Sequence, residues 1–206
     1  QWEWSGDSTE TSDLQAVSTY RYTVEAANSG QYPLPDQREP FNFVLDSSAS
    51  GNLVDVIVGV RLNHTWPGDL EFSLIHPDGT IVVLARNNGW GSHRDGSEVW
   101  GTGSQSCSGD LAYFSDAALE SINERQKPYS GFSSPVETLS QFNGKVASGA
   151  WTLRITDNEP QDYGDFFCGE IILTTNEPDD QLVSSSNILL SDNSAEWDLT
   201  NPLPNP

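Results

Sequence analysis

The chain has no methionine, only two cysteines and three histidines, and few basic residues. Its 206 residues include nine lysines and arginines against 30 aspartates and glutamates, so the formal net charge is 9 − 30 = −21. A field this negative disfavours binding to nucleic acid and to anionic membranes, because both require a basic protein surface. It favours solubility and divalent cations, although solvation alone explains most of the individual acids.

The two cysteines, Cys107 and Cys168, form no Cys-x-x-Cys pair, which argues against a zinc or redox motif. We expect one disulfide between them, which implies an oxidising, extracellular compartment; two unrelated buried thiols are the alternative. No signal peptide or transmembrane span is present. The chain opens on Gln1-Trp2-Glu3-Trp4, which we interpret as the start of an excised fragment, so any secretion signal would lie outside it.

Short alternating segments separated by turn residues fill the middle of the chain. In 53–62, Val54, Val56, Val58, Val60 and Leu62 are expected to point to one face of a strand. The one expected helix lies in 115–126, where Ser115 or Asp116 is a candidate cap and Ala118, Leu119 and Ile122 form an apolar side. The other expected strands are 20–24, 41–45, 70–74, 81–84, 151–155 and 166–173.

Many short strands and almost no helix predict an all-β fold, an antiparallel β-sandwich. We expect a linker in 1–18, one sandwich domain in 19–176 and a C-terminal extension or linker in 177–206.

Several short phrases occur in a characteristic order. They are His64-Thr65-Trp66-Pro67-Gly68-Asp69-Leu70, Pro77-Asp78-Gly79-Thr80, Phe142-Asn143-Gly144, Gly149-Ala150-Trp151-Thr152-Leu153, and Asp157 with Asp162-Tyr163-Gly164-Asp165; Leu34-Pro35-Asp36 precedes them. Together they resemble the P domain (P/Homo B domain) that follows the catalytic domain in kexin- and furin-like proteases and in many secreted bacterial subtilisin-like proteases. The chain departs from the family pattern at His76, where a serine is usual, and at Gly169, where the family often has a tryptophan.

The resemblance covers roughly residues 30–175 and implies a jelly-roll sandwich of about eight strands. It also implies an accessory role: docking on a subtilisin-like catalytic domain in the same parent chain and support of that domain's folding and stability. The Cys107–Cys168 pair looks like an elaboration of this chain rather than a family feature.

The sequence offers little for catalysis. Only His64, His76 and His93 could act as the base of a serine protease, no Gly-x-Ser-x-Gly elbow is present, and the missing methionine rules out the subtilisin phrase Gly-Thr-Ser-Met-Ala. The 30 acids leave a glycosidase pair of carboxylates open. We therefore expect no catalytic residue in this chain.

Calcium is the expected ligand. The metal ion needs several oxygens at one place, and one short segment carries Asp157, Asn158, Glu159, Asp162 and Asp165. The spacing is not that of an EF-hand, and a solvated acidic turn is the alternative; bacterial relatives of the P domain, however, commonly bind calcium. The expected ligands are Asp36, Asp69, Asp157, Asp162 and Asp165.

Trp66, Trp90 and Trp100 lie near Gly-rich segments. Exposed tryptophans stack on sugars or grip peptides, whereas buried ones only anchor their loops, which is the interpretation we favour. The sequence therefore predicts a secreted, monomeric, non-catalytic P domain without nucleic-acid or membrane partners. The alternative is a carbohydrate- or matrix-binding jelly-roll module with a peptide or glycan surface.

Overall fold

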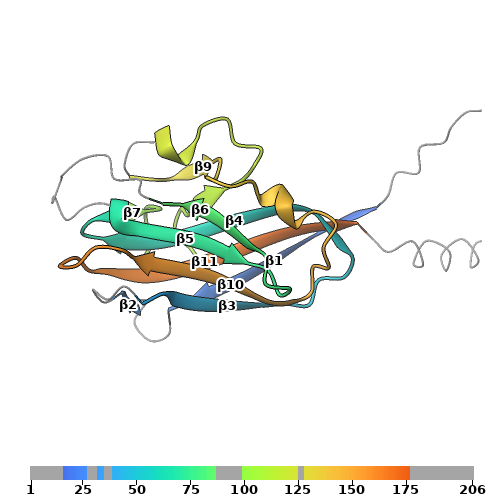
Figure 1. The fold of residues 1–206 in the computed structure, drawn as a ribbon, viewed down its shortest axis with the longest axis horizontal. Coiled ribbons are helices and arrows are strands. Elements are labelled where there is room, and N and C mark those ends of the chain that lie inside the picture. Colours follow the sequence, from blue (N-terminus) through green and yellow to red (C-terminus); the bar gives the residue numbers. More distant parts are fainter. Residues whose placement is uncertain (1–15, 27–31, 35–38, 87–98, 125–127, 177–206) are drawn as a thin grey trace, which may run out of the picture.

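The computed structural model describes residues 16–26, 32–34, 39–86, 99–124 and 128–176 (Figure 1). These residues form eleven strands and three short 3-10 helices. The elements are β1 (Val17–Glu25), β2 (Tyr32–Leu34), β3 (Phe41–Ser47), β4 (Asn52–His64), η1 (Pro67–Asp69), β5 (Leu70–Ile75), β6 (Ile81–Ala85), β7 (Val99–Trp100), β8 (Ala112–Phe114), η2 (Ile122–Glu124), β9 (Gly131–Ser133), η3 (Leu139–Phe142), β10 (Gly149–Asp157) and β11 (Gly164–Asn176).

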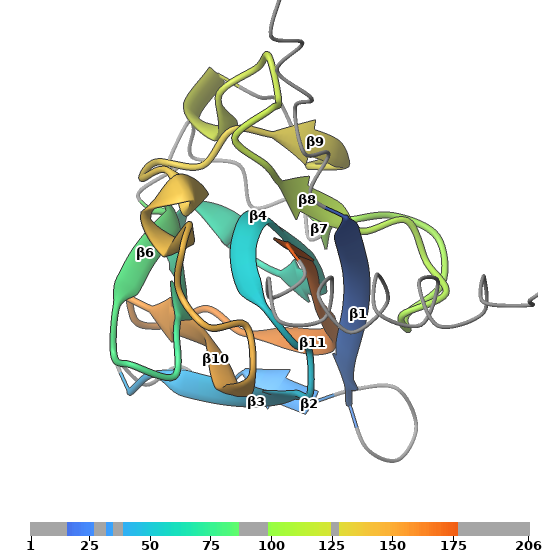
Figure 2. The same ribbon diagram turned by 90° about the vertical axis from the view of Figure 1, so that its right-hand side faces the viewer.

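The strands form two sheets, which confirms the predicted β-sandwich (Figures 1 and 2). The large sheet has the order β1-β11-β4-β8-β9, with β2 on β11 and β7 on β4; the small sheet has the order β3-β10-β5-β6. All pairs are antiparallel except β8 and β9. The seven longer strands correspond to the seven segments expected from the sequence. The remaining four, β2, β7, β8 and β9, are only two or three residues long and show no alternation.

The core lies between the sheets and is rich in aromatic rings. Trp100 is fully buried, with ring centroids 4.6 Å from Phe72 and 4.2 Å from Tyr129. Stacked and tilted aromatic pairs of this kind add about 0.5–1.5 kcal/mol each beyond the area that they bury. The long strands that were expected from alternation supply most of the remaining core residues, such as Val58 and Leu153.

One expected inward residue points outward. Val54 is 39% exposed, while its neighbour Leu53 is buried. The cause is a register shift between Thr174 and Thr175 of β11, which pair with Asp55 and Leu53 and leave Val54 as an extra residue. The alternation therefore holds from Val56 onward and fails at the bulge.

The helix expected in 115–126 does not form in the described part of that segment, which holds turns and η2 only. The backbone pairs with another segment instead: the Ile122 amide donates to the Ser134 carbonyl, and the Ser134 amide donates to the Glu120 carbonyl. Leu119 of the expected apolar side is fully exposed. The Asp116 carboxylate accepts the amides of Leu139 and Ser140 (both 2.8 Å), so it caps η3 rather than a helix of its own.

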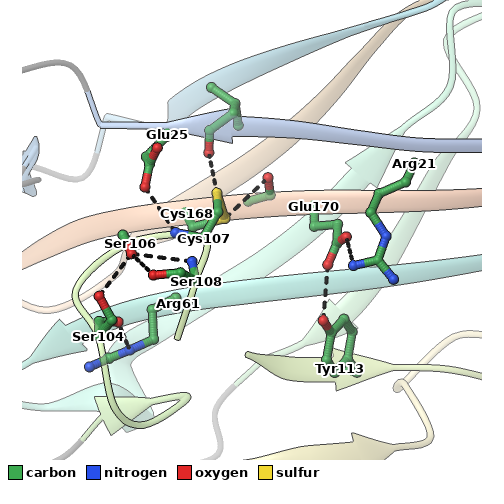
Figure 3. The surroundings of a disulfide bond; sticks show 12 residues. Arg21, Glu25, Arg61, Ser104, Ser106, Cys107, Ser108, Tyr113, Cys168 and Glu170 are labelled. Atoms are coloured by element: carbon green, nitrogen blue, oxygen red, sulfur yellow. Dashed lines mark hydrogen bonds and ion pairs between the residues drawn. A yellow bond between two sulfur atoms is a disulfide. The ribbon is translucent and has the colours of Figure 1, made fainter. Parts of the chain in front are cut away.

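A disulfide joins Cys107 to Cys168, as predicted, and ties the loop after β7 to β11 (Figure 3). Beneath that loop, Arg61 is only 4% exposed and its guanidinium donates to the carbonyls of Ser104 (3.2 Å) and Gly103 (3.3 Å). The same group lies 5.1 Å from the ring centroid of Phe167. A buried charge is thus compensated by carbonyl acceptors and by an aromatic face.

Candidate functional site

The sequence phrases meet at two opposite ends of the paired strands β5 and β10. At one end, β10 finishes at Asp157 opposite Leu70; at the other, it begins at Gly149 near the turn that contains Pro77. We call the Asp157 end the acidic rim. It consists of η1 and the connection 158–163 between β10 and β11.

The acidic rim is held together by a network around Thr65. The Thr65 hydroxyl donates to Oδ1 of Asp162 (3.0 Å) and accepts the Tyr163 amide (3.0 Å). Gly164 follows, and a side chain there would meet the Asn63 carbonyl oxygen at 2.1 Å. Only glycine therefore allows β11 to start this close to β4, which brings the connection 158–163 against the end of β4.

A buried histidine–carboxylate pair lies beneath the acidic rim. His64 and Asp157 have side chains 0% and 1% exposed, and Nε2 of His64 lies 3.3 Å from Oδ2 of Asp157. Nδ1 of His64 accepts the Trp66 amide (3.2 Å), so the proton of the neutral ring lies on Nε2, facing the carboxylate. Sequence reasoning treated these two residues separately, because only the fold brings the ends of β4 and β10 together.

The carboxylates of the rim perturb one another. Burial, and then the charges of Asp162, Asp157 and Glu159, raise the pKa of Asp69 to about 6. Like charges at close range disfavour ionisation. Asp69, Asp157 and Asp162, which were predicted as ligands, thus belong to one electrostatic group, to which Glu159 contributes.

The other two expected calcium ligands are Asp165 and Asp36. The Asp165 amide donates to the Asn63 side chain (2.7 Å), and Asp165 lines a cavity of about 200 Å³ together with His64 and Tyr163. Asp165 is not among the largest contributors to the pKa shift of Asp69. Asp36 lies outside the described residues.

Calcium fits the donor chemistry of the rim, since all these groups offer hard carboxylate oxygens. Within the described ranges, no three His, Cys, Asp or Glu side chains converge closely enough to form a ready metal site. The ligand set of five therefore stays a prediction, and the residues that the fold gathers are Asp69, Asp157 and Asp162.

The opposite end is a packed turn rather than a reactive site. His76 is 5% exposed; its Nδ1 accepts the Asp78 amide (3.0 Å) and its Nε2 contacts the Val146 carbonyl (3.0 Å). Its ring stacks on Phe142 and meets Trp151 edge-on at 4.7 Å. His76, which replaces the family's serine, thus joins three of the phrases through packing.

Of the three tryptophans considered as binding sites, two lie within the described residues. Trp100 is fully buried, so it anchors its strand, and Trp66 is half-buried beside its own turn. Trp90 and His93 lie outside the described residues. Gly169 faces inward, where a side chain would meet Leu153 at 2.7 Å, so this edge has no room for the family's tryptophan.

Known proteins were compared with the chain by sequence and by structure. No curated protein matches it. Two solved structures of the Aeromonas sobria serine protease, one in complex with its chaperone, align at 14% and 15% identity with TM-scores of 0.48 and 0.47. They cover 80% and 79% of this chain, which spans only 28% of each of theirs, and at TM-scores below 0.5 they carry no weight for function.

Part of the chain matches a known protein family. Residues 53–113 match the family described as the proprotein convertase P-domain. The match includes the phrases His64–Leu70 and Pro77–Thr80, while the phrases from Phe142 onward lie beyond it. Residues 53–113 are therefore similar to the proprotein convertase P-domain family, in agreement with the predicted resemblance.

Proposed function

We propose that this chain is a non-catalytic accessory domain of a secreted subtilisin-like serine endopeptidase, which packs on the catalytic domain of the same parent chain and supports its folding and stability. The observation that carries the proposal is the P-domain match over residues 53–113. The disulfide between Cys107 and Cys168 supports an extracellular location, since such bonds persist in oxidising compartments. No helix in the described ranges is long and apolar enough to cross a membrane.

The surroundings of His64 and His76, the two histidines within the described residues, support a non-catalytic role. A histidine base needs a nucleophile within hydrogen-bond reach. His64 and His76 are both buried, and the partners of their ring nitrogens are backbone groups and the carboxylates of Asp157 and Asp78. These contacts hold both rings in place at the ends of strands, which is a structural role.

The outer face of the small sheet supplies a docking surface for the catalytic domain. The register places Val44, Thr152, Ile75 and Ile81 side by side across β3, β10, β5 and β6. Val44 is 52% and Ile81 47% exposed, at the two ends of this row. We call these four residues the small-sheet row. Covering such a row removes apolar surface from water, at about 25 cal/mol per Å² before the costs of association.

The test places charge on the small-sheet row. In the full parent protease, V44D/I81D should shorten the half-life of protease activity at elevated temperature, because two carboxylates would be buried unpaired against the catalytic domain. The matched control is V17D, since Val17 is 63% exposed at the start of β1 in the other sheet. A half-life equal to that of the control would reject this surface. A parent gene without a subtilisin-like domain would reject the function itself.

We propose further that calcium binds at the acidic rim and holds its two loops together. Asp69, Asp157 and Asp162 would supply the first carboxylate oxygens. The support is the pKa of Asp69, which burial, and then repulsion by the neighbouring carboxylates, raise to about 6. A divalent cation would relieve the repulsion. The ion would add stability to the loops and take part in no chemical step.

Calorimetric titration of chelator-treated protein tests the calcium proposal. A single site at 100 times its Kd would raise the free energy of unfolding by about 2.7 kcal/mol, or roughly 5–10 °C in melting temperature for a chain of this size. D162N should weaken the binding, whereas D46N, on the exposed face of β3, should not. No heat of binding together with an unchanged melting temperature would reject the proposal.

A further inference from the structure

A cavity of about 340 Å³ lies in the region of β8, β9 and the loop after β7, and we call it the β9 pocket. Its lining includes Thr102, Asp110, Leu111, Tyr113, Ser130 and Phe132. β9 is the last strand of the large sheet, and β8 and β9 lie on the side of the molecule away from β3 and β10 (Figures 1 and 2). The β9 pocket is thus separate from the small-sheet row.

Two stacked rings line the β9 pocket. Tyr113 and Phe132 are paired across β8 and β9, with ring centroids 5.0 Å apart and planes inclined by 16°. Phe132 is 50% exposed, so half of its side chain is open to solvent. The pair therefore offers an aromatic face to a ligand.

Tyr113 is held in place by a hydrogen bond of its hydroxyl group. Its hydroxyl donates to Oε2 of buried Glu170 (3.0 Å), whose Oε1 is paired with Arg21 at 2.6 Å (Figure 3). Burial and the Glu170 carboxylate raise the pKa of Tyr113, so its hydroxyl stays a donor at neutral pH. A ring held in this way loses little freedom when a ligand binds.

The lining also carries a negative charge. Asp110 is exposed, and its Oδ2 accepts the Thr102 hydroxyl (3.3 Å). Backbone hydrogen bonds of 2.7 and 2.9 Å pair the same two residues, and the disulfide of Cys107 anchors the loop between them. Among the described residues that line the β9 pocket, none is a lysine or an arginine.

A carboxylate beside an exposed aromatic face suits a planar cation. A guanidinium stacks on aromatic rings and forms fork-like hydrogen bonds with a carboxylate. The volume is at the small end for ligand cavities, which suits one long side chain, and the net charge of −21 attracts cations to the whole surface. We infer that the β9 pocket binds an arginine side chain presented by a partner polypeptide.

The test uses the 206-residue chain and a blocked pentapeptide with one arginine between glycines. Its partner peptide carries citrulline, which has the same shape without the charge. NMR titration should shift the amide signals of Asp110, Tyr113 and Phe132 with the arginine peptide, and the citrulline peptide should bind at least fivefold more weakly. Because this comparison uses the unaltered protein, it does not depend on any variant folding.

Matched variants then locate the contact. D110N and F132A should each weaken arginine-peptide binding at least fivefold, whereas D46N and L119A, which change an exposed acid and an exposed leucine elsewhere, should leave it unchanged. Equal binding of the two peptides, equal effects of D110N and D46N, or an absence of shifts at the β9 pocket would overturn the inference. So would shifts of the same signals by cello-oligosaccharides alone, which would make the pocket a sugar site.

Discussion

Asp69 offers the sharpest quantitative test of the acidic rim. Its carboxyl group makes no hydrogen bond with another described residue, and it carries a pKa raised to about 6 by burial and by Asp162, Asp157 and Glu159. Replacing it with asparagine keeps the shape of the side chain and removes the charge. In the presence of a chelator at pH 7.5, we expect D69N to be more stable than the wild type.

The expected gain in stability of D69N follows from the difference between the pKa of Asp69 in the folded and in the unfolded state. An unfolded aspartate titrates near 3.9, so a folded pKa of about 6 corresponds to roughly 2 units, or at most about 3 kcal/mol. Asp69 is only half-buried and solvent screens its neighbours, so we expect about 1 kcal/mol.

Because the pKa of Asp69 is raised in the folded state, its effect on stability depends on pH in a defined direction. Between about pH 4 and 6 the folded Asp69 binds more protons than the unfolded one, so the wild type gains stability as the pH falls through 6. The advantage of D69N should therefore shrink to less than about half of its neutral value by pH 4, on the same linkage relation.

Urea unfolding of the wild type, D69N and the exposed control D46N, each with EDTA at pH 7.5 and pH 4, measures both effects. A D69N protein less stable than the wild type at pH 7.5, or an equal gain at both pH values, would refute the reasoning. Repeating the series with calcium should reverse the order, because D69N would lose a ligand.

Three further changes test the fold of the sandwich. C107A/C168A should lower the free energy of unfolding by about 4 kcal/mol in the chain-entropy view, because the bond spans 61 residues, and an unchanged urea midpoint would contradict this. R61K should cost about 2–3 kcal/mol in urea unfolding, because a single ammonium cannot reach all the carbonyls that the guanidinium reaches; the exposed control R86K should cost less than about 0.5 kcal/mol. W151F should cost about 1–3 kcal/mol by the same assay, since the Ala147 carbonyl loses its indole donor (3.0 Å), and a cost near zero would show that water replaces it.

Sequence patterns predicted the long strands well, because alternation follows directly from one buried face. The stretch from Val56 to Leu62 behaves as expected. Val54 does not, because it is the bulged residue of β4, and this bulge depends on the pairing of β4 with β11, more than 100 residues away in the chain. The helix near Ser115 failed for a similar reason, since its backbone groups and Asp116 found partners in Ser134 and η3.

The candidate sites, like the strands, could be predicted only in part from the sequence. Asp157, Glu159 and Asp162 could be named from sequence, because they lie close together in one short segment at the end of β10, whereas Asp69 lies apart in η1. The buried contact of His64 with Asp157 could not, because it arises only when β4 and β10 end side by side. The Tyr113–Phe132 stack was also missed, because β8 and β9 are three residues long and pair in parallel, which leaves no periodic signal.

In the function proposed above, this domain stabilises a catalytic domain and performs no catalysis of its own. The most direct measurement is the half-life of protease activity of the parent enzyme at elevated temperature, with and without residues 19–176. We predict that removal shortens the half-life at least tenfold while the isolated 206-residue chain hydrolyses no casein. An unchanged half-life, or casein hydrolysis by the isolated chain, would contradict the account.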